Sequence, residues 1–180
     1  QLNEVEIFEN YIIIAPGGSK ENTSGRGMVT KKWPLEYYTE LIEELLKNDK
    51  SIVLIFGPDD KHEYKYFRNL EKIENVKIVF MAPIDIVIEI IRKTSCFIGN
   101  DSGLFHIADL FNKPHYVFFG PSNYRNYGPI SESGILFRNN LKCSPCDYMN
   151  KKCPYNVECL IDLTPSEIIP QIISAVHNNK

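Results

Sequence analysis

The sequence has no apolar run that approaches the roughly 20 residues of a membrane-spanning helix. Its first six residues lack the basic and apolar segments of a secretory signal peptide. Positive charge is not in excess either, because 20 Lys and Arg residues face 23 Asp and Glu residues, for a formal net charge of -3. A general nucleic-acid binder normally carries a basic surface that shows in such totals, so we expect no nucleic-acid partner. These absences predict a soluble, cytoplasmic protein without a transmembrane segment.

Several catalytic signatures are also missing. There is no Gly-x-Gly-x-x-Gly fingerprint, which weakens the case for NAD or FAD. No trio of nucleophile, base and orienting acid is visible, and no cluster of His and carboxylates has the spacing of a catalytic metal site. The sequence therefore predicts half of an active site, which holds a ligand but lacks an evident group to take a proton.

What is present is the pattern of one α/β domain spanning residues 1–180, since 43% hydrophobic residues suffice for one core. Apolar runs that end at Gly or Pro are typical of strands buried on both faces of a parallel sheet. We expect strands at 11–15, 51–56, 76–80, 96–99, 115–119 and 134–137, and helices at 34–47, 63–72, 84–93, 104–111 and 165–177. In the helix 84–93, Ile84, Val87, Ile88 and Ile91 form the expected buried stripe. The fold class is thus a Rossmann-like open parallel sheet with helices on both faces.

Four distinctive loops follow the predicted strands, at 16–18, 57–60, 100–103 and 120–123. Open α/β sheets bind ligands at the carboxyl ends of their strands, so we expect these loops to share one edge. Together they could hold a nucleotide diphosphate.

The segment from Asn100 to His106 is the most informative one. A strand runs into a small polar turn that opens a helix, and a helix N-terminus with Ser102 and Gly103 lets an anion approach the main chain. The alternative is a plain N-cap, in which Asp101 or Ser102 accepts a helix amide and His106 is structural.

Three further features belong to the same edge. Lys31 could bring a positive charge to a phosphate near the Gly17-Gly18 turn, or it could be an ordinary solvated lysine. Asp59 and Asp60 could accept hydrogen bonds from ribose hydroxyls, or serve as an ordinary helix N-cap.

Cys96 lies in a predicted strand, but the other four cysteines lie within residues 143–159, a loop inserted before the last helix. Cys143, Cys146, Cys153 and Cys159 could hold a structural zinc ion or an iron–sulfur cluster. Four thiolates would leave no open coordination position for chemistry. Reduced surface thiols and two local disulfides are the alternatives.

The motifs quoted above occur in a specific order along nearly the whole chain. The order is Ile14-Ala-Pro-Gly-Gly18, Lys31-Lys-Trp-Pro34, Phe56-Gly-Pro-Asp-Asp60, Gly99-Asn-Asp-Ser-Gly-Leu-Phe-His106, Phe119-Gly-Pro-Ser122 and Gly128-Pro129, followed by the Cys-x2-Cys pair. In this order they resemble the C-terminal domain of glycosyltransferase family 9, the family of the ADP-heptose:lipopolysaccharide heptosyltransferases.

The resemblance implies a two-domain GT-B glycosyltransferase, inverting and independent of metal or other cofactors in catalysis. It would transfer heptose from ADP-heptose to the lipopolysaccharide core or a related surface glycan. The glycolipid acceptor and the carboxylate base belong to the N-terminal domain, which this chain would lack, so the isolated domain is expected to be inactive. Such an enzyme would work at the inner face of the bacterial inner membrane, with peripheral membrane association.

Carried over by position, Lys31 would contact the donor phosphates and Gly17 and Gly18 would line them. The resemblance implies further that Asp59 binds the ribose, that Met81 and Ala82 lie near the adenine, and that Asp101, Ser102, Gly103 and His106 form the diphosphate-facing turn. The loop 19–30 departs from the family in its length and in its glycines. A GT-B-like nucleotide-sugar epimerase and a non-catalytic, metal-stabilised binding module are the alternative functions.

Overall fold

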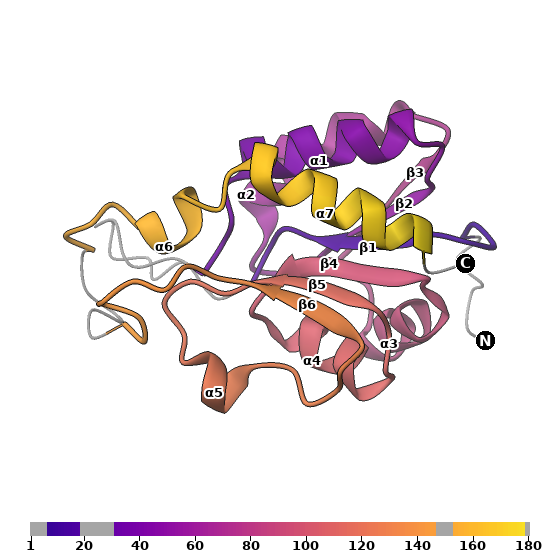
Figure 1. Ribbon diagram of the computed structural model, residues 1–180. Coiled ribbons are helices and arrows are strands. Elements are labelled where there is room, and N and C mark those ends of the chain that lie inside the picture. Colours follow the sequence, from indigo (N-terminus) through magenta and orange to yellow (C-terminus); the bar gives the residue numbers. More distant parts are fainter. Residues whose placement is uncertain (1–6, 19–30, 147–152, 179–180) are drawn as a thin grey trace.

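The computed structural model describes residues 7–18, 31–146 and 153–178 (Figure 1). Its strands are β1 (Ile12–Ala15), β2 (Ile52–Phe56), β3 (Val76–Phe80), β4 (Cys96–Asn100), β5 (His115–Phe118) and β6 (Gly134–Phe137). Its helices are α1 (Leu35–Lys47), α2 (Lys61–Phe67), the 3-10 helix η1 (Arg68–Lys72), α3 (Ile84–Lys93), α4 (Gly103–Leu110), α5 (Tyr124–Tyr127), α6 (Glu158–Ile161) and α7 (Pro165–Asn178).

The strands form one parallel sheet in the order β3-β2-β1-β4-β5-β6. The predicted open parallel sheet is therefore confirmed. The chain leaves β1 for β2 on one side and returns to add β4 on the other, with Ile13 paired to Val53 and to Phe97. The strand order reverses between β1 and β4, and in such sheets this switch point is where ligands bind.

Alternating residues of the central strands feed two cores. On β1, Ile12 and Ile14 pack into the core beneath α1 and α7, whereas Ile13 and Ala15 pack into the core beneath α3 and α4. Figure 1 shows these helix pairs on opposite faces of the sheet. The prediction of helices on both faces is confirmed, and burial on both faces explains why the strands read as uninterrupted apolar runs.

Several local predictions were wrong. The helix predicted at 63–72 begins at Lys61 and changes to a 3-10 helix at Arg68. Neither Ile84 nor Ile88 is buried in the stripe of α3: Ile84 is 60% exposed, Ile88 is half-buried, and Ile90 is buried instead. Ile84 is the first residue of its helix, and it lines the open pocket at the edge of the sheet. The short helices α5 and α6 were not predicted, because four residues are too few to show a period.

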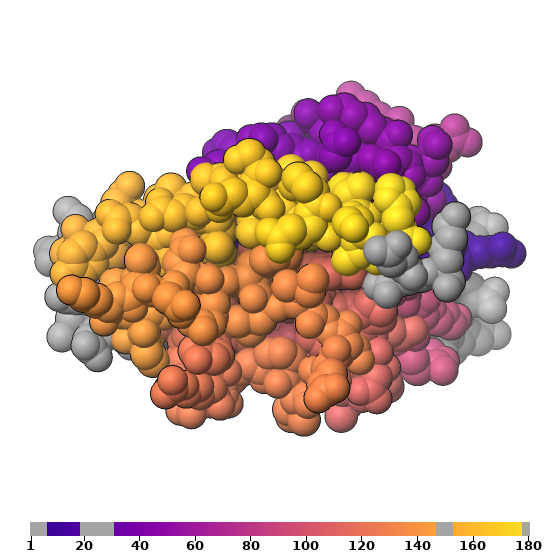
Figure 2. All heavy atoms as spheres, in the orientation of Figure 1, coloured from indigo at the N-terminus to yellow at the C-terminus, as the bar shows by residue number. Residues whose placement is uncertain are grey.

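The space-filling view shows α7 covering one face between α1 and the segment that contains β6 (Figure 2). Within the residues that the structure describes, no helix is both long enough and apolar enough to cross a membrane.

Candidate functional site

One open pocket of about 530 Å³ lies at the carboxyl ends of β1, β2 and β4, beside the switch point. It is lined by Ala15, Gly17, Gly18, Ile55, Phe56, Gly57, Pro58, Asp60, Ala82, Ile84, Val87, Ser102, Gly103, Leu104 and Ile107. The structure thus brings together five of the predicted site residues: Gly17, Gly18, Ala82, Ser102 and Gly103.

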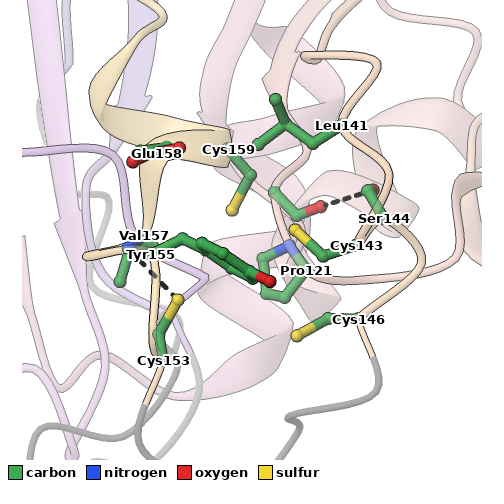
Figure 3. A pocket seen from close by; sticks show the side chains of 11 residues that line it. Pro121, Leu141, Cys143, Ser144, Cys146, Cys153, Tyr155, Val157, Glu158 and Cys159 are labelled. Carbon is green, nitrogen blue, oxygen red and sulfur yellow. Dashed lines mark hydrogen bonds between the residues drawn. The ribbon is translucent and has the colours of Figure 1, made fainter.

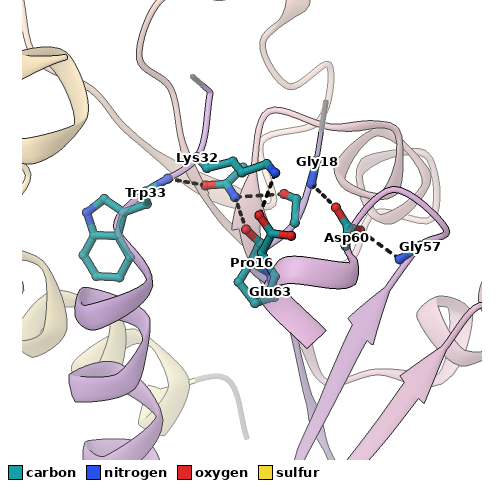
Figure 4. Close-up of polar contacts among 9 residues, drawn as sticks. Pro16, Gly18, Lys32, Trp33, Gly57, Asp60 and Glu63 are labelled. Atoms are coloured by element: carbon teal, nitrogen blue, oxygen red, sulfur yellow. Dashed lines mark hydrogen bonds and ion pairs between the residues drawn. The ribbon is translucent and has the colours of Figure 1, made fainter. Parts of the chain in front are cut away.

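The Gly17-Gly18 turn is held by Asp60, which is only 9% exposed. The Asp60 carboxylate accepts the Gly18 N–H at 3.0 Å and the Gly57 N–H at 2.8 Å (Figure 4). Asp60 occupies the N-cap position of α2, but its side chain makes no hydrogen bond to that helix. The interpretation of Asp60 as an ordinary N-cap was therefore wrong, because the carboxylate joins two pocket loops instead.

Glycine is required at the turn for two reasons. A Cβ built on Gly17 would overlap the carboxylate of Asp60. Gly18 has a φ of +125°, which other residues rarely adopt. The turn can therefore bring its main chain close to a ligand only with this sequence.

The start of α4 carries the next predicted group. Lys31 Nζ lies 2.8 Å from Asp101 Oδ2, and His106 Nε2 lies 4.0 Å from Asp101 Oδ1. Asp101 is buried, and in the described part of the chain the side chain of the N-cap residue, Ser102, makes no capping hydrogen bond to α4. The plain N-cap and the solvated lysine were thus both wrong as alternatives. The first amides of α4 can therefore receive an anion beside Ser102 and Gly103, and Lys31 is held close by through its ion pair with Asp101, the residue before Ser102.

Five predicted residues lie outside this pocket lining: Lys31, Asp101 and His106, which meet at the start of α4, and Asp59 and Met81. Asp59 is exposed, and Met81 is 50% exposed with a left-handed φ of 56°. Their proposed contacts with ribose and adenine stay predictions. The fourth predicted loop, 120–123, does not line this pocket. Its Gly120 and Pro121 line a second pocket near the cysteines instead. The loop 19–30 lies outside the described residues.

The apolar part of the pocket was not predicted from the sequence. Ile55, Val87 and Ile107 approach it from β2, α3 and α4 respectively. These residues resembled core residues in the sequence, and only the topology shows that they meet at an open edge. An apolar cleft that adjoins a turn and a helix N-terminus suits a ligand with a flat ring and an anionic group.

A buried ion pair and a buried amide lie beneath the turn. Lys32 Nζ lies 2.7 Å from Glu63 Oε1, and Figure 4 shows this pair next to Pro16. Asn100, at the end of β4, is 0% exposed. The sequence indicates Asn100 only as a polar residue at the end of an apolar strand. Its hydrogen-bond partners lie far away in the sequence and could not be predicted.

The four clustered cysteines line a small pocket of about 10 Å³ with Gly120, Pro121 and Tyr155 (Figure 3). Burial, followed by the charges of the other three cysteines, raises the pKa of Cys159 to about 12. All five cysteines are free thiols in this structure, and Cys96 is buried in β4 as predicted. In the described ranges, no three His, Cys, Asp or Glu side chains lie close enough to hold a metal ion as they stand.

Comparison with known proteins adds three similarities. A lipooligosaccharide heptosyltransferase 2 from Campylobacter jejuni is 24% identical over 154 residues, which is 83% of this chain and 48% of that protein. The structure of an E. coli ADP-heptose lipopolysaccharide heptosyltransferase II matches with a TM-score of 0.73 and 21% identity, over 94% of this chain and 47% of the other. An iron-containing dodecameric glycosyltransferase, TibC, from enterotoxigenic E. coli H10407 matches with a TM-score of 0.66 and 18% identity, over 96% of this chain and 47% of that one.

The chain spans about half the length of the curated relatives that it matches, 48% for the protein from Campylobacter jejuni. At such identities, the structural similarities show the fold alone. The sequence model of glycosyltransferase family 9 (heptosyltransferase), however, matches residues 1–156, which is most of the chain. The chain therefore belongs to glycosyltransferase family 9, the heptosyltransferase family.

Proposed function

We propose that this chain is the nucleotide-sugar-binding half of an inverting, metal-independent glycosyltransferase. The complete enzyme transfers heptose from ADP-heptose to the lipopolysaccharide core or a related surface glycan. The observation that carries the proposal is the pocket at the switch point, where an apolar cleft adjoins the Gly17-Gly18 turn and the start of α4. Membership in a transferase family favours this function over the epimerase and the non-catalytic module.

Two parts of the pocket receive two parts of the donor. The base packs against the apolar side chains near Ala82, while the diphosphate lies at the turn and at the first amides of α4. Asp59 and Met81 contribute at the rim, where ribose and base meet solvent. Similarity to an ADP-heptose heptosyltransferase supports ADP as the nucleotide.

The chemical task of this half is to stabilise the charge that develops on the departing diphosphate. Helix amides and a lysine ammonium do this when they are already positioned before the reaction. Lys31 is held within 2.8 Å of Asp101, next to Ser102 and Gly103, so its charge is in place without a metal ion. The glycolipid acceptor and the carboxylate that deprotonates it come from a second domain, as the family resemblance implies.

Calorimetric titration with ADP, UDP and GDP tests this proposal. We expect saturable binding with preference for ADP, unchanged by EDTA. We expect Lys31→Ala to weaken ADP binding about tenfold, because one charge-assisted contact to phosphate is lost. Adenosine binding should stay the same, since it has no phosphate.

Lys47→Ala is the matched control. Lys47 pairs with Glu44 on the exposed surface of α1, so this change removes the same charge away from the pocket. An equal loss of affinity in both variants would show that Lys31 acts only through the net charge of the protein and not through a contact with the phosphate. No ADP binding by the wild-type chain, or an unchanged dissociation constant in Lys31→Ala, would contradict the donor site or the role of Lys31, respectively.

We also propose that Cys143, Cys146, Cys153 and Cys159 bind one structural zinc ion or iron–sulfur cluster. Two observations support this: all four line one pocket, and a structural neighbour of the chain is an iron-containing enzyme. In the described structure the four thiols are too far apart to bind one metal ion together, so they would have to move closer when the metal binds. The group would hold the loop against Gly120 and Pro121, with no part in the reaction.

Elemental analysis of the purified protein tests this second proposal. We expect about one zinc equivalent, or a cluster with visible absorbance, and its loss in Cys143→Ser. Cys96→Ser is the matched control, because Cys96 is buried in β4 and does not line the cysteine pocket. Metal-free wild-type protein from cells supplied with zinc and iron would contradict the proposal.

A further inference from the structure

Asn100 uses its full hydrogen-bonding capacity inside the protein. Its Nδ2 donates to the carbonyls of Pro16 and Gly17, each at 2.9 Å. Its Oδ1 accepts the Trp33 N–H at 2.9 Å and the Tyr38 hydroxyl at 2.9 Å. An amide has two N–H groups and two acceptor sites, so all four are occupied. The side chain is 0% exposed, which makes each of these bonds costly to lose.

These bonds fix the plane of the Gly17-Gly18 peptide from both ends. The Gly17 carbonyl points to Asn100, and the N–H of the same peptide group points to Asp60, at 3.0 Å. In a trans peptide these two groups point in opposite directions, so the peptide cannot rotate without losing both bonds. The Pro16 carbonyl also points to Asn100, so the Gly17 N–H is turned away from it.

The same amide sets the start of α1. Trp33, whose N–H bonds to Asn100, lies two residues after Lys31. Lys31 bonds in turn to Asp101, the residue that follows Asn100. The turn after β1 and the lysine are thus both positioned relative to the end of β4.

We propose that Asn100 is a positioning residue for the anionic part of the ligand. It holds the Gly17-Gly18 main chain and Lys31 in the arrangement that receives a diphosphate, without touching the ligand itself. No other small side chain supplies this pattern: aspartate has no donor for the two carbonyls, and leucine has neither donor nor acceptor. This inference rests on the proposed donor site.

Calorimetry of Asn100→Ser with three probes tests it: ADP, inorganic diphosphate and adenosine. We expect affinity for ADP and diphosphate to fall about tenfold, while affinity for adenosine changes less than about twofold, because the apolar cleft is unaffected. A residue that merely supports the fold would weaken all three or none. If Asn100→Ser does not fold, Asn100→Gln, which keeps the amide but displaces it, takes its place with the same expectation.

Tyr38→Phe is the matched control. It removes one hydrogen bond from Asn100 Oδ1 and leaves the bonds to Pro16 and Gly17 intact, so we expect lower stability with unchanged affinity for all three probes. Unchanged diphosphate affinity in the Asn100 variant, or an equal loss for adenosine, would overturn the inference alone. Failure of the wild-type chain to bind ADP and diphosphate would overturn the proposed function, and this inference with it.

Discussion

Replacing Trp33 with alanine is expected to lower the free energy of unfolding by about 3–5 kcal/mol, the range for truncating a large aromatic residue in a core. Trp33 is 0% exposed and stacks on Phe118 of β5, with ring centroids 4.1 Å apart and planes 10° apart. Its indole N–H donates to the Leu163 carbonyl at 2.8 Å. The side chain therefore joins α1, the sheet and the segment before α7, and denaturant unfolding would measure its loss.

Two variants separate the parts of this effect. Trp33→Phe keeps an aromatic ring against Phe118 but leaves the Leu163 carbonyl without its donor, so we expect a loss of about 1–2 kcal/mol. Ile130→Ala removes an apolar side chain that is 96% exposed and should change stability by less than about 0.5 kcal/mol. If Trp33→Ala cost no more than the Ile130 change, the packing of α1 on the sheet described above would be wrong.

The fold could be predicted from the sequence because each strand and helix is indicated by residues that are neighbours in the sequence. The residues 52–56 are a continuous apolar run that ends at Gly57-Pro58, and such a run is typical of a strand covered on both faces. Where the prediction failed, the deciding information was not local. Ile84 fits the apolar period of α3, but it begins the helix at the edge of the sheet, so it lines the pocket instead of the core.

The candidate site was predictable in its loops but not in its contacts. Glycines and polar residues after strands indicated the edge, since parallel strands end together there. The choice between Asp59 and Asp60 depended on where α2 begins, and one residue decides which carboxylate faces Gly57 and which is exposed. Asn100 joins residues more than 60 positions away, at Trp33 and Tyr38, and no spacing rule links such partners.

Gly17→Ala is expected to weaken ADP binding about 10- to 100-fold, as measured by calorimetry. The added Cβ would overlap the carboxylate of Asp60, so either this carboxylate or the turn must move. Asp60 is short and anchored to α2, so its displacement breaks the hydrogen bonds to Gly18 and Gly57. The turn then loses the orientation in which it faces the pocket, and unfolding stability falls as well because the half-buried N–H groups of Gly18 and Gly57 lose their acceptor.

A double-mutant cycle with Asp60→Ala tests this cause. If the clash acts through Asp60, removing the carboxylate first makes the change at Gly17 nearly harmless, so the two effects on affinity should be far from additive. Gly103→Ala is the matched glycine control for stability, because its Cβ meets no atom within 4 Å in the described structure, and its free energy of unfolding should stay constant or rise. Additive effects of Gly17→Ala and Asp60→Ala would show instead that the two residues act on the ligand independently, and that the carboxylate does not hold the turn in place.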